Sequence, residues 1–126
     1  SIKINEATYN CGDFVIYKES STRVGRILAI VKVDDLLKIK VQRILIFNEL
    51  PNNLQSNNRR ERSCGREVWL LDRNEENAII IVELHKIVKH ITVTILYNEN
   101  EINESSSIVI REILYKYQGH WKLRNI

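Results

Sequence analysis

Residues 25 to 47, GRILAIVKVDDLLKIKVQRILIF, carry the clearest indication of the fold. Its first half is apolar at every second position, a period typical of a β-strand with one buried side. These positions are Gly25, Ile27, Ala29, Val31 and Val33. Asp34-Asp35 supplies a polar turn, and a second alternating segment runs from Leu37 to Phe47, with Ile44 and Ile46 making its far end apolar on both faces. The stretch therefore predicts a β-hairpin that is covered on both sides near residue 47.

Apolar segments on both sides of this hairpin predict more strands. They cover residues 14 to 18, 67 to 72, 87 to 97 on odd positions, 108 to 117, and 121 to 126. The run from Ala78 to Leu84 is too short to assign by its period, so a buried strand and a short helix are both open, with a strand favoured. Residues 48 to 66 and 98 to 107 predict two long polar loops. The sequence has 19 Ile and three Ala, which also favours strands, although codon bias in an AT-rich genome is an alternative source of that excess.

Length and composition limit the class of protein. A chain of 126 residues is the size of one domain, so residues 1 to 126 are expected to fold as a single unit. The net charge of +3 does not by itself predict a nucleic-acid partner. Two cysteines are too few for a disulfide scaffold, and no apolar stretch reaches the roughly 18 residues that predict a membrane span. The absence of Met suggests a piece of a longer protein.

Four short motifs follow one another along the chain: Gly12-Asp13-Phe14-Val15, Val24-Gly25-Arg26-Ile27, Lys40-Val41-Gln42-Arg43 and Glu67-Val68-Trp69-Leu70-Leu71-Asp72. In this order they resemble motifs of the bromo-adjacent homology (BAH) domain of chromatin proteins. The first two resemble the opening strands of the family, the third its Val-x-Val-Arg strand and the fourth its Glu-Leu-aromatic-Leu-Ser segment. Asn48-Glu49 falls where the family has Arg-Pro-Glu, and residues 110 to 121 resemble its terminal strands. A Tudor or SH3-like barrel with insertions is the competing family.

The resemblance implies a mainly β fold: one partly closed β-barrel-like domain with short peripheral helices and long loops. It also implies a non-catalytic module that binds other proteins in chromatin, and hence nuclear localisation. The expected partner is a chromatin or nuclear protein, with histones and nucleosomes included. The oligomeric state does not follow from the sequence.

The family's methyl-lysine readers use an aromatic cage, because a methylammonium is held by cation–π attraction to several ring faces. Two cage aromatics usually follow the strand arginine, where this chain has Ile44-Leu45-Ile46. A shifted cage of Tyr17, Phe47 and Trp69 is the remaining candidate. The alternative is core packing, which is favoured because each ring lies within an apolar segment.

Arg59, Arg60, Arg62 and Arg66 lie close together in the first polar loop, with Glu61 as the only acid among them. Guanidinium groups bind phosphates and carboxylates, so these residues are the candidate contact for nucleic acid or for an acidic protein surface. A nucleic-acid-binding module that uses this loop is thus the alternative function. The competing interpretation is a charged loop that only keeps the protein soluble.

The residues predict no catalytic centre, metal site or cofactor. His85, His90 and His120 are scattered, and Cys11 and Cys64 form no Cys-x-x-Cys pair. The four glycines form neither a Walker loop nor a dinucleotide-binding turn. The chain is therefore expected not to be an enzyme.

Overall fold

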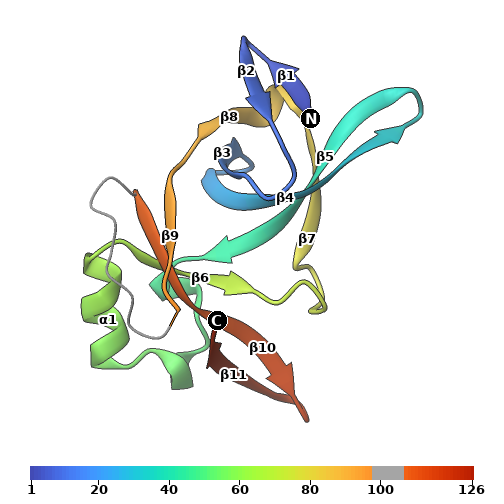
Figure 1. Cartoon of the computed structure of the whole chain (residues 1–126). Helices are drawn as coiled ribbons and strands as arrows, with labels where there is room; N and C mark the ends of the chain where they lie inside the picture. The colour runs from blue at the N-terminus through green and yellow to red at the C-terminus, as the bar shows by residue number, and fades with distance from the viewer. Residues whose placement is uncertain (98–106) are drawn as a thin grey trace. The chain divides into compact units, whose positions relative to one another are not determined.

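A computed structural model describes residues 1 to 97 and 107 to 126 of the chain (Figure 1). The chain forms two compact units, each built from two separate segments. Unit 1 comprises Ser1–Arg43 and Glu76–Ile91, and unit 2 comprises Ile44–Glu75 and Thr92–Ile126. The expectation of a single domain stays a prediction.

Unit 1 is a sheet of five strands with an added hairpin. The sheet has the order β8 (Ile87–His90), β3 (Phe14–Lys18), β4 (Thr22–Val33), β5 (Leu36–Leu45) and β7 (Ile79–Glu83). The short helix η3 (Leu84–Lys86) joins β7 to β8, and β1 (Ile2–Ile4) pairs with β2 (Ala7–Tyr9). All ladders in this unit are antiparallel.

The predicted hairpin of residues 25 to 47 is confirmed by β4 and β5. Its turn is Asp34-Asp35, and both residues have positive φ, 51° and 64°, as a two-residue type I′ turn requires. The predicted face is wrong beyond Ile27, because a bulge shifts the register between Ile27 and Ala29. Since a bulge exchanges the two faces of a strand, Ile30 packs against the core instead of the odd-numbered residues that follow Ala29.

The core of unit 1 is apolar throughout. Its buried residues are Tyr9, Val15, Tyr17, Ile27, Ile39, Val41, Val82 and Ile87. Gly25 permits this packing, because a Cβ at that position would lie 2.2 Å from Val41 Cγ1 and 3.0 Å from Tyr17 Cε1. The ring of Tyr17 thus occupies space that any larger residue at position 25 would need.

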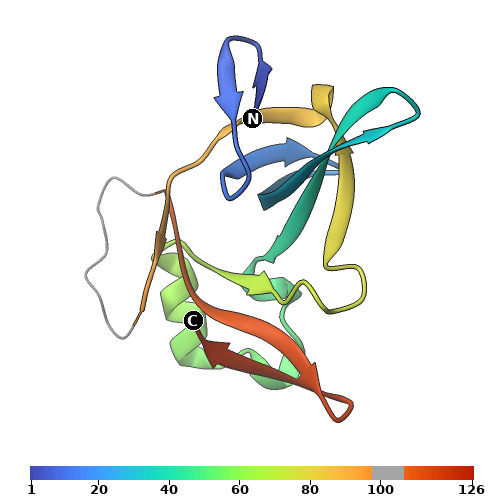
Figure 2. The same cartoon turned by 45° about the vertical axis from the view of Figure 1, so that its right-hand side comes forward.

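Unit 2 contains the remaining elements. The last two residues of β5, Ile44 and Leu45, pair with β6 (Glu67–Leu71), and β6 pairs in parallel with β10 (Ile108–Tyr117). Strand β9 (Val93–Ile95) also runs parallel to β10, whereas β11 (His120–Asn125) returns antiparallel to it. Between β5 and β6 lie two short 3₁₀ helices, η1 (Phe47–Glu49) and η2 (Asn52–Leu54), and the helix α1 (Asn57–Cys64). Figures 1 and 2 both show α1 beside β6.

The prediction of a long polar loop for residues 48 to 66 is wrong, because this segment contains the helices η1, η2 and α1. Helix α1 starts at a Ser56 cap whose Oγ accepts a hydrogen bond from Arg59 N at 3.2 Å. The helix buries none of its residues, so ion pairs rather than an apolar stripe hold it in place. The second predicted loop, 98 to 107, lies outside the described residues except for Ser107.

The mainly β prediction is confirmed for the described residues. Their strand pairings do not close a sheet into a barrel, so they do not support the barrel-like part of the prediction. The Ala78–Leu84 run forms strand β7, as favoured, while the single strand expected at 87 to 97 is two strands, β8 and β9, which belong to different units. In the described ranges, no helix has the length and apolar character needed to cross a membrane.

Candidate functional site in unit 2

The four arginines predicted to bind a partner do not act together. Arg59, Arg60 and Arg62 lie on α1, and Arg66 follows it with a left-handed φ of 74°. Arg59 and Arg62 are three residues apart and share one face of the helix, whereas Arg60 is displaced by about 100° around its axis. The structure therefore divides the cluster into an inward pair and an outward pair.

The Arg59 side chain binds a carboxylate of strand β10. Its Nε and Nη2 atoms donate to the two oxygens of Glu112, each at 3.1 Å. Its Nη1 donates to the backbone carbonyl of Leu54 at 3.2 Å. Each nitrogen of this guanidinium thus has a partner within unit 2, in the two-pronged geometry that makes arginine–carboxylate pairs strong.

Arg62 connects the same carboxylate to a second one at the start of β6. Its Nε donates to Glu67 Oε2 at 2.9 Å, and its Nη2 contacts both Glu67 Oε2 and Glu112 Oε1. Two further donors complete the network: Arg111 Nε binds Glu67 Oε1 at 3.3 Å, and Trp69 Nε1 binds Glu112 Oε1 at 3.1 Å. We refer to Arg59, Arg62, Glu67, Trp69, Arg111 and Glu112 as the ion network.

The backbone explains why both carboxylates reach one helix. Strands β6 and β10 are neighbours, and their register shifts between Ile110 and Ile113. Such an irregularity re-aims the side chains beside it, here Arg111 and Glu112, which in a regular strand would point to opposite faces. Both of these residues instead join the ion network.

The ion network is largely shielded from water. The side chains of Glu67 and Glu112 are 3% and 8% exposed. Burial alone raises the pKa of Glu112, but hydrogen bonds from Arg59 and Trp69, with the charges of Arg59 and Arg62, outweigh it, so the net pKa is lowered. A carboxylate that is held ionised by four N–H donors is suited to fixing α1 on the sheet rather than to exchanging protons.

The outward arginines line a groove of about 570 Å³ within unit 2. The guanidinium carbon of Arg60 lies 4.8 Å from the centre of the Phe47 ring. Most of the groove surface is apolar, and Ile46, which is 53% exposed, lines it together with polar residues. The residues of this "α1 groove" are Ile46, Phe47, Asn48, Arg60, Ser63, Cys64, Arg66, Glu67, Val68, Ser107 and Ile108.

The burial of Tyr17, Phe47 and Trp69 contradicts the predicted shifted aromatic cage. Tyr17 and Trp69 have no exposed surface and Phe47 is 5% exposed, so these rings cannot present open faces to a methylammonium. Tyr17 packs in the core of unit 1, while Phe47 contacts Trp69 in unit 2 with ring centres 6.2 Å apart. Core packing, the favoured alternative, describes all three.

The remaining candidate ligands are dispersed. His90 stacks on Tyr9 and contacts Asp13 Oδ2 at 3.0 Å, and His85 lies 3.4 Å from Glu83. Cys11 and Cys64 are exposed free thiols that belong to different units. Within residues 1 to 97 and 107 to 126, no three His, Cys, Asp or Glu side chains gather as metal ligands would.

Sequence reasoning missed the two carboxylates that hold the inward arginines. A signal was present, because Glu67 opens an otherwise apolar strand and Glu112 interrupts the run from Ile108 to Leu114. A glutamate inside an apolar strand is rarely buried without a partner.

Comparison with protein-family models gave no match to this chain. A search of curated proteins also gave no match.

Proposed function

We propose that this chain is a non-catalytic protein-interaction module that binds its partner in the α1 groove. The observation that carries the proposal is the combination of an apolar groove with Arg60 at its edge. Within the described residues, the Arg60 side chain contacts the Phe47 ring rather than a carboxylate. Its charge is therefore available to a ligand, unlike the charges of Arg59 and Arg62.

The lining defines the chemistry of the partner segment. Ile46 offers an exposed apolar surface beside the largely buried Phe47, Val68 and Ile108, and Arg60 places a positive charge at its edge. An aliphatic side chain flanked by an acidic residue satisfies both features, since desolvated apolar contacts provide affinity and charge provides orientation. The expected ligand is thus an acidic segment of another protein.

The chromatin setting is proposed from the resemblance to BAH domains. The motifs behind it coincide with strands: residues 14 and 15 open β3, residues 24 to 27 lie in β4, residues 40 to 43 lie in β5, and residues 67 to 71 are β6. A BAH-type module implies a nuclear protein and a nucleosomal or other chromatin partner. The partly closed barrel belongs to the same proposal.

Nucleic-acid binding by the four arginines is less well supported. Arg59 and Arg62 use their guanidinium groups inside the ion network, so they are not available to phosphates. A variant that lacks all four arginines would also disturb the fold. The test should therefore change only the outward pair.

The experiment measures binding of the protein to reconstituted nucleosomes, to histone octamers and to free duplex DNA of the same sequence. The double variant Arg60→Ser/Arg66→Ser is compared with Arg73→Ser, an exposed arginine that does not line the groove. We expect the double variant to weaken nucleosome and histone binding about tenfold, and Arg73→Ser to leave it unchanged.

Two outcomes would contradict the proposal. If the wild-type protein binds neither nucleosomes nor histones, the chromatin part fails. If the double variant loses free DNA and nucleosomes to the same extent, with no contact to histones, the basic-cluster alternative replaces it, and a steep dependence on salt would accompany that result.

A further inference from the structure

The β10–β11 hairpin combines positive charges with exposed aromatic rings. Residues 108 to 126 contain Arg111, Lys116, Lys122 and Arg124, while their only acid, Glu112, is buried in the ion network. The same hairpin carries Tyr115, Tyr117 and Trp121. The formal excess of positive charge in this segment equals the net charge of the whole chain, +3.

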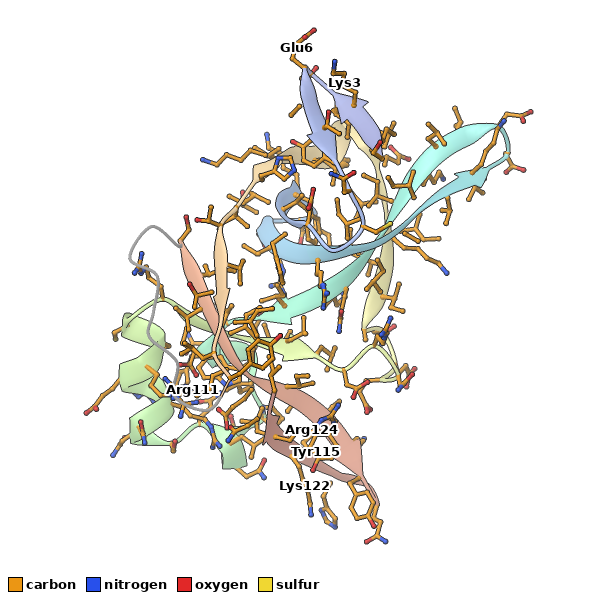
Figure 3. All side chains as sticks on the ribbon, viewed as in Figure 1. Lys3, Glu6, Arg111, Tyr115, Lys122 and Arg124 are labelled. Carbon is orange, nitrogen blue, oxygen red and sulfur yellow. The ribbon has the colours of Figure 1, made fainter. Side chains whose placement is uncertain are left out.

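The register of the hairpin sorts these side chains by face. Tyr115 pairs with Lys122 and Tyr117 with His120, so these four share one face with Arg124, which pairs with Ile113. Leu114, Lys116, Trp121 and Leu123 share the other face, where Leu114 is buried. The first face is turned to solvent, since Tyr117 is 54% exposed and His120, Lys122 and Arg124 are exposed. Figure 3 shows Tyr115, Lys122 and Arg124 close together on this hairpin.

Rings and cations alternate on the solvent face. The guanidinium carbon of Arg124 lies 4.7 Å from the centre of the Tyr115 ring, and Lys122 Nζ lies 5.3 Å from that of Tyr117. With Lys116 and Trp121 on the other face at 5.2 Å, the hairpin holds three cation–π contacts. These three are among five such contacts in the described residues, and two of them lie on the solvent face of the hairpin.

We propose that the solvent face of the β10–β11 hairpin binds single-stranded nucleic acid. Unpaired bases stack on aromatic rings and guanidinium planes, and the neighbouring cations neutralise the phosphates. Duplex nucleic acid hides its base faces and would use only the charges. Tyr117 presents a ring that is 54% exposed, which suits stacked bases better than an acidic peptide.

Two acidic side chains accept hydrogen bonds from this hairpin. Asp72 Oδ2 accepts a hydrogen bond from Arg124 Nη2 at 2.7 Å, and Glu75 accepts one from the backbone N–H of Lys116 at 3.1 Å. The Asp72 contact occupies one of the five donors of the Arg124 guanidinium. It also holds that guanidinium beside Tyr115, so less side-chain entropy is lost when a base or phosphate binds.

The test is fluorescence anisotropy with labelled oligo(dT) and oligo(U), and with a duplex of the same length, at low salt. The wild-type protein is expected to prefer the single strands. Tyr117→Leu and Tyr115→Leu should each weaken single-strand binding about tenfold. Duplex binding should change little, because each Tyr→Leu variant keeps an apolar side chain and the same net charge as the wild type.

A matched pair of variants distinguishes the effect of a charge on the proposed face from the effect of net charge alone. Lys122→Gln and Lys116→Gln each remove one positive charge, but only Lys122 lies on the proposed face. We expect Lys122→Gln to weaken single-strand binding more and to lower the salt slope by about 0.7, and circular dichroism should show both variants folded. The proposal is overturned if the wild type does not bind single strands, if duplex binds equally well, if the tyrosine variants bind normally, or if poly-glutamate competes as well as an oligonucleotide.

Discussion

The two units are stabilised by different interactions. Unit 1 has an apolar core in which a glycine leaves room for a tyrosine ring. Unit 2 adds to its apolar core a set of buried charges that attaches a fully polar helix to the sheet. The comparison shows that arginines which look like a binding surface in the sequence can be internal supports.

The largest effect is expected from Arg62→Ala in unit 2. This change removes the link between two buried carboxylates, and a buried charge without its partner typically costs 3–5 kcal/mol. Because the Arg62 side chain is 23% exposed and other donors remain, we expect a loss near the lower limit, about 3 kcal/mol in the free energy of unfolding. Urea denaturation gives the total loss, and amide exchange in β6 and β10 locates it.

Arg60→Ala is the matched control, since it makes the same change on the same helix but faces outward. It should cost about 1 kcal/mol or less, the value of a surface cation–π contact. Equal losses for the two variants would contradict the division of α1 into inward and outward arginines.

The corresponding change in unit 1 is Gly25→Ala, which tests packing instead of charge. The new Cβ would lie 2.2 Å from Val41 Cγ1 and 3.1 Å from the carbonyl oxygen of Gln42, so the strands must shift. We expect a loss of about 2 kcal/mol, typical of overpacking in a core. Thermal denaturation measures it, and amide exchange should place it in β3, β4 and β5.

A double variant checks the cause of that loss. Val41→Ala removes the Cγ1 atom that an alanine at position 25 would meet. The double variant Gly25→Ala/Val41→Ala should therefore lose less stability than the sum of the two single variants. Simple additivity would argue against the predicted clash.

Acid should weaken unit 2 through Glu112. Because its pKa is lowered in the folded protein, the unfolded chain takes up protons first, near the ordinary value of 4.5. The contribution of Glu112 is thus complete above that pH and is lost as the pH falls through the lowered pKa. Stability measured by urea between about pH 7 and pH 3 should fall more steeply for wild type than for Glu112→Gln.

Glu61→Gln provides the control for this series, since Glu61 is an exposed carboxylate on the same helix. Its profile should follow that of the wild type. A Glu112→Gln profile parallel to the wild type would show that the carboxylate contributes no pH-dependent stability.

The smallest effect is expected from Tyr17→Phe in unit 1, which removes a buried hydroxyl beside Arg23. At neutral pH we expect a change of about 1 kcal/mol or less. Burial, with the negative charge of Glu19, raises the pKa of Tyr17 above 10.0, although Arg43 and Arg23 offset part of the rise. The unfolded state therefore ionises first, and wild-type stability should fall faster above pH 10 than that of Tyr17→Phe.

Tyr97→Phe, at an exposed position, should leave the alkaline profile unchanged. A marked loss of stability in Tyr17→Phe at neutral pH would instead reveal a hydrogen bond from this hydroxyl.

The local elements were largely predictable from the sequence. Alternation predicted β4 and β5, and apolar segments bounded by polar or turn residues predicted β3, β6 and β10. The N-terminal hairpin was missed, since β1 and β2 are too short for a period and turn at Asn5-Glu6 through two residues with positive φ. Helix α1 was missed because its only start signal is the Ser56 cap.

The candidate site was predictable only in part. The arginine cluster was visible, but its division was not, because the partners Glu67 and Glu112 come from strands that meet only in the folded protein. The bulge at Arg111 and Glu112 depends on the same long-range pairing. Local sequence patterns carry no information on which distant carboxylate a helix will face.

The parallel β6–β10 ladder has a consequence for the order of folding. Unit 1 receives its last strand, β8, by His90, whereas unit 2 can pair β6 with the end of β5 but cannot form the β6–β10 ladder until Ile108 and the residues after it are synthesised. Closing that long connection is slow compared with forming the β4–β5 hairpin. On the ribosome, unit 1 is therefore expected to acquire protection from proteases first, while β6 and the arginines of α1 wait for their partner strand.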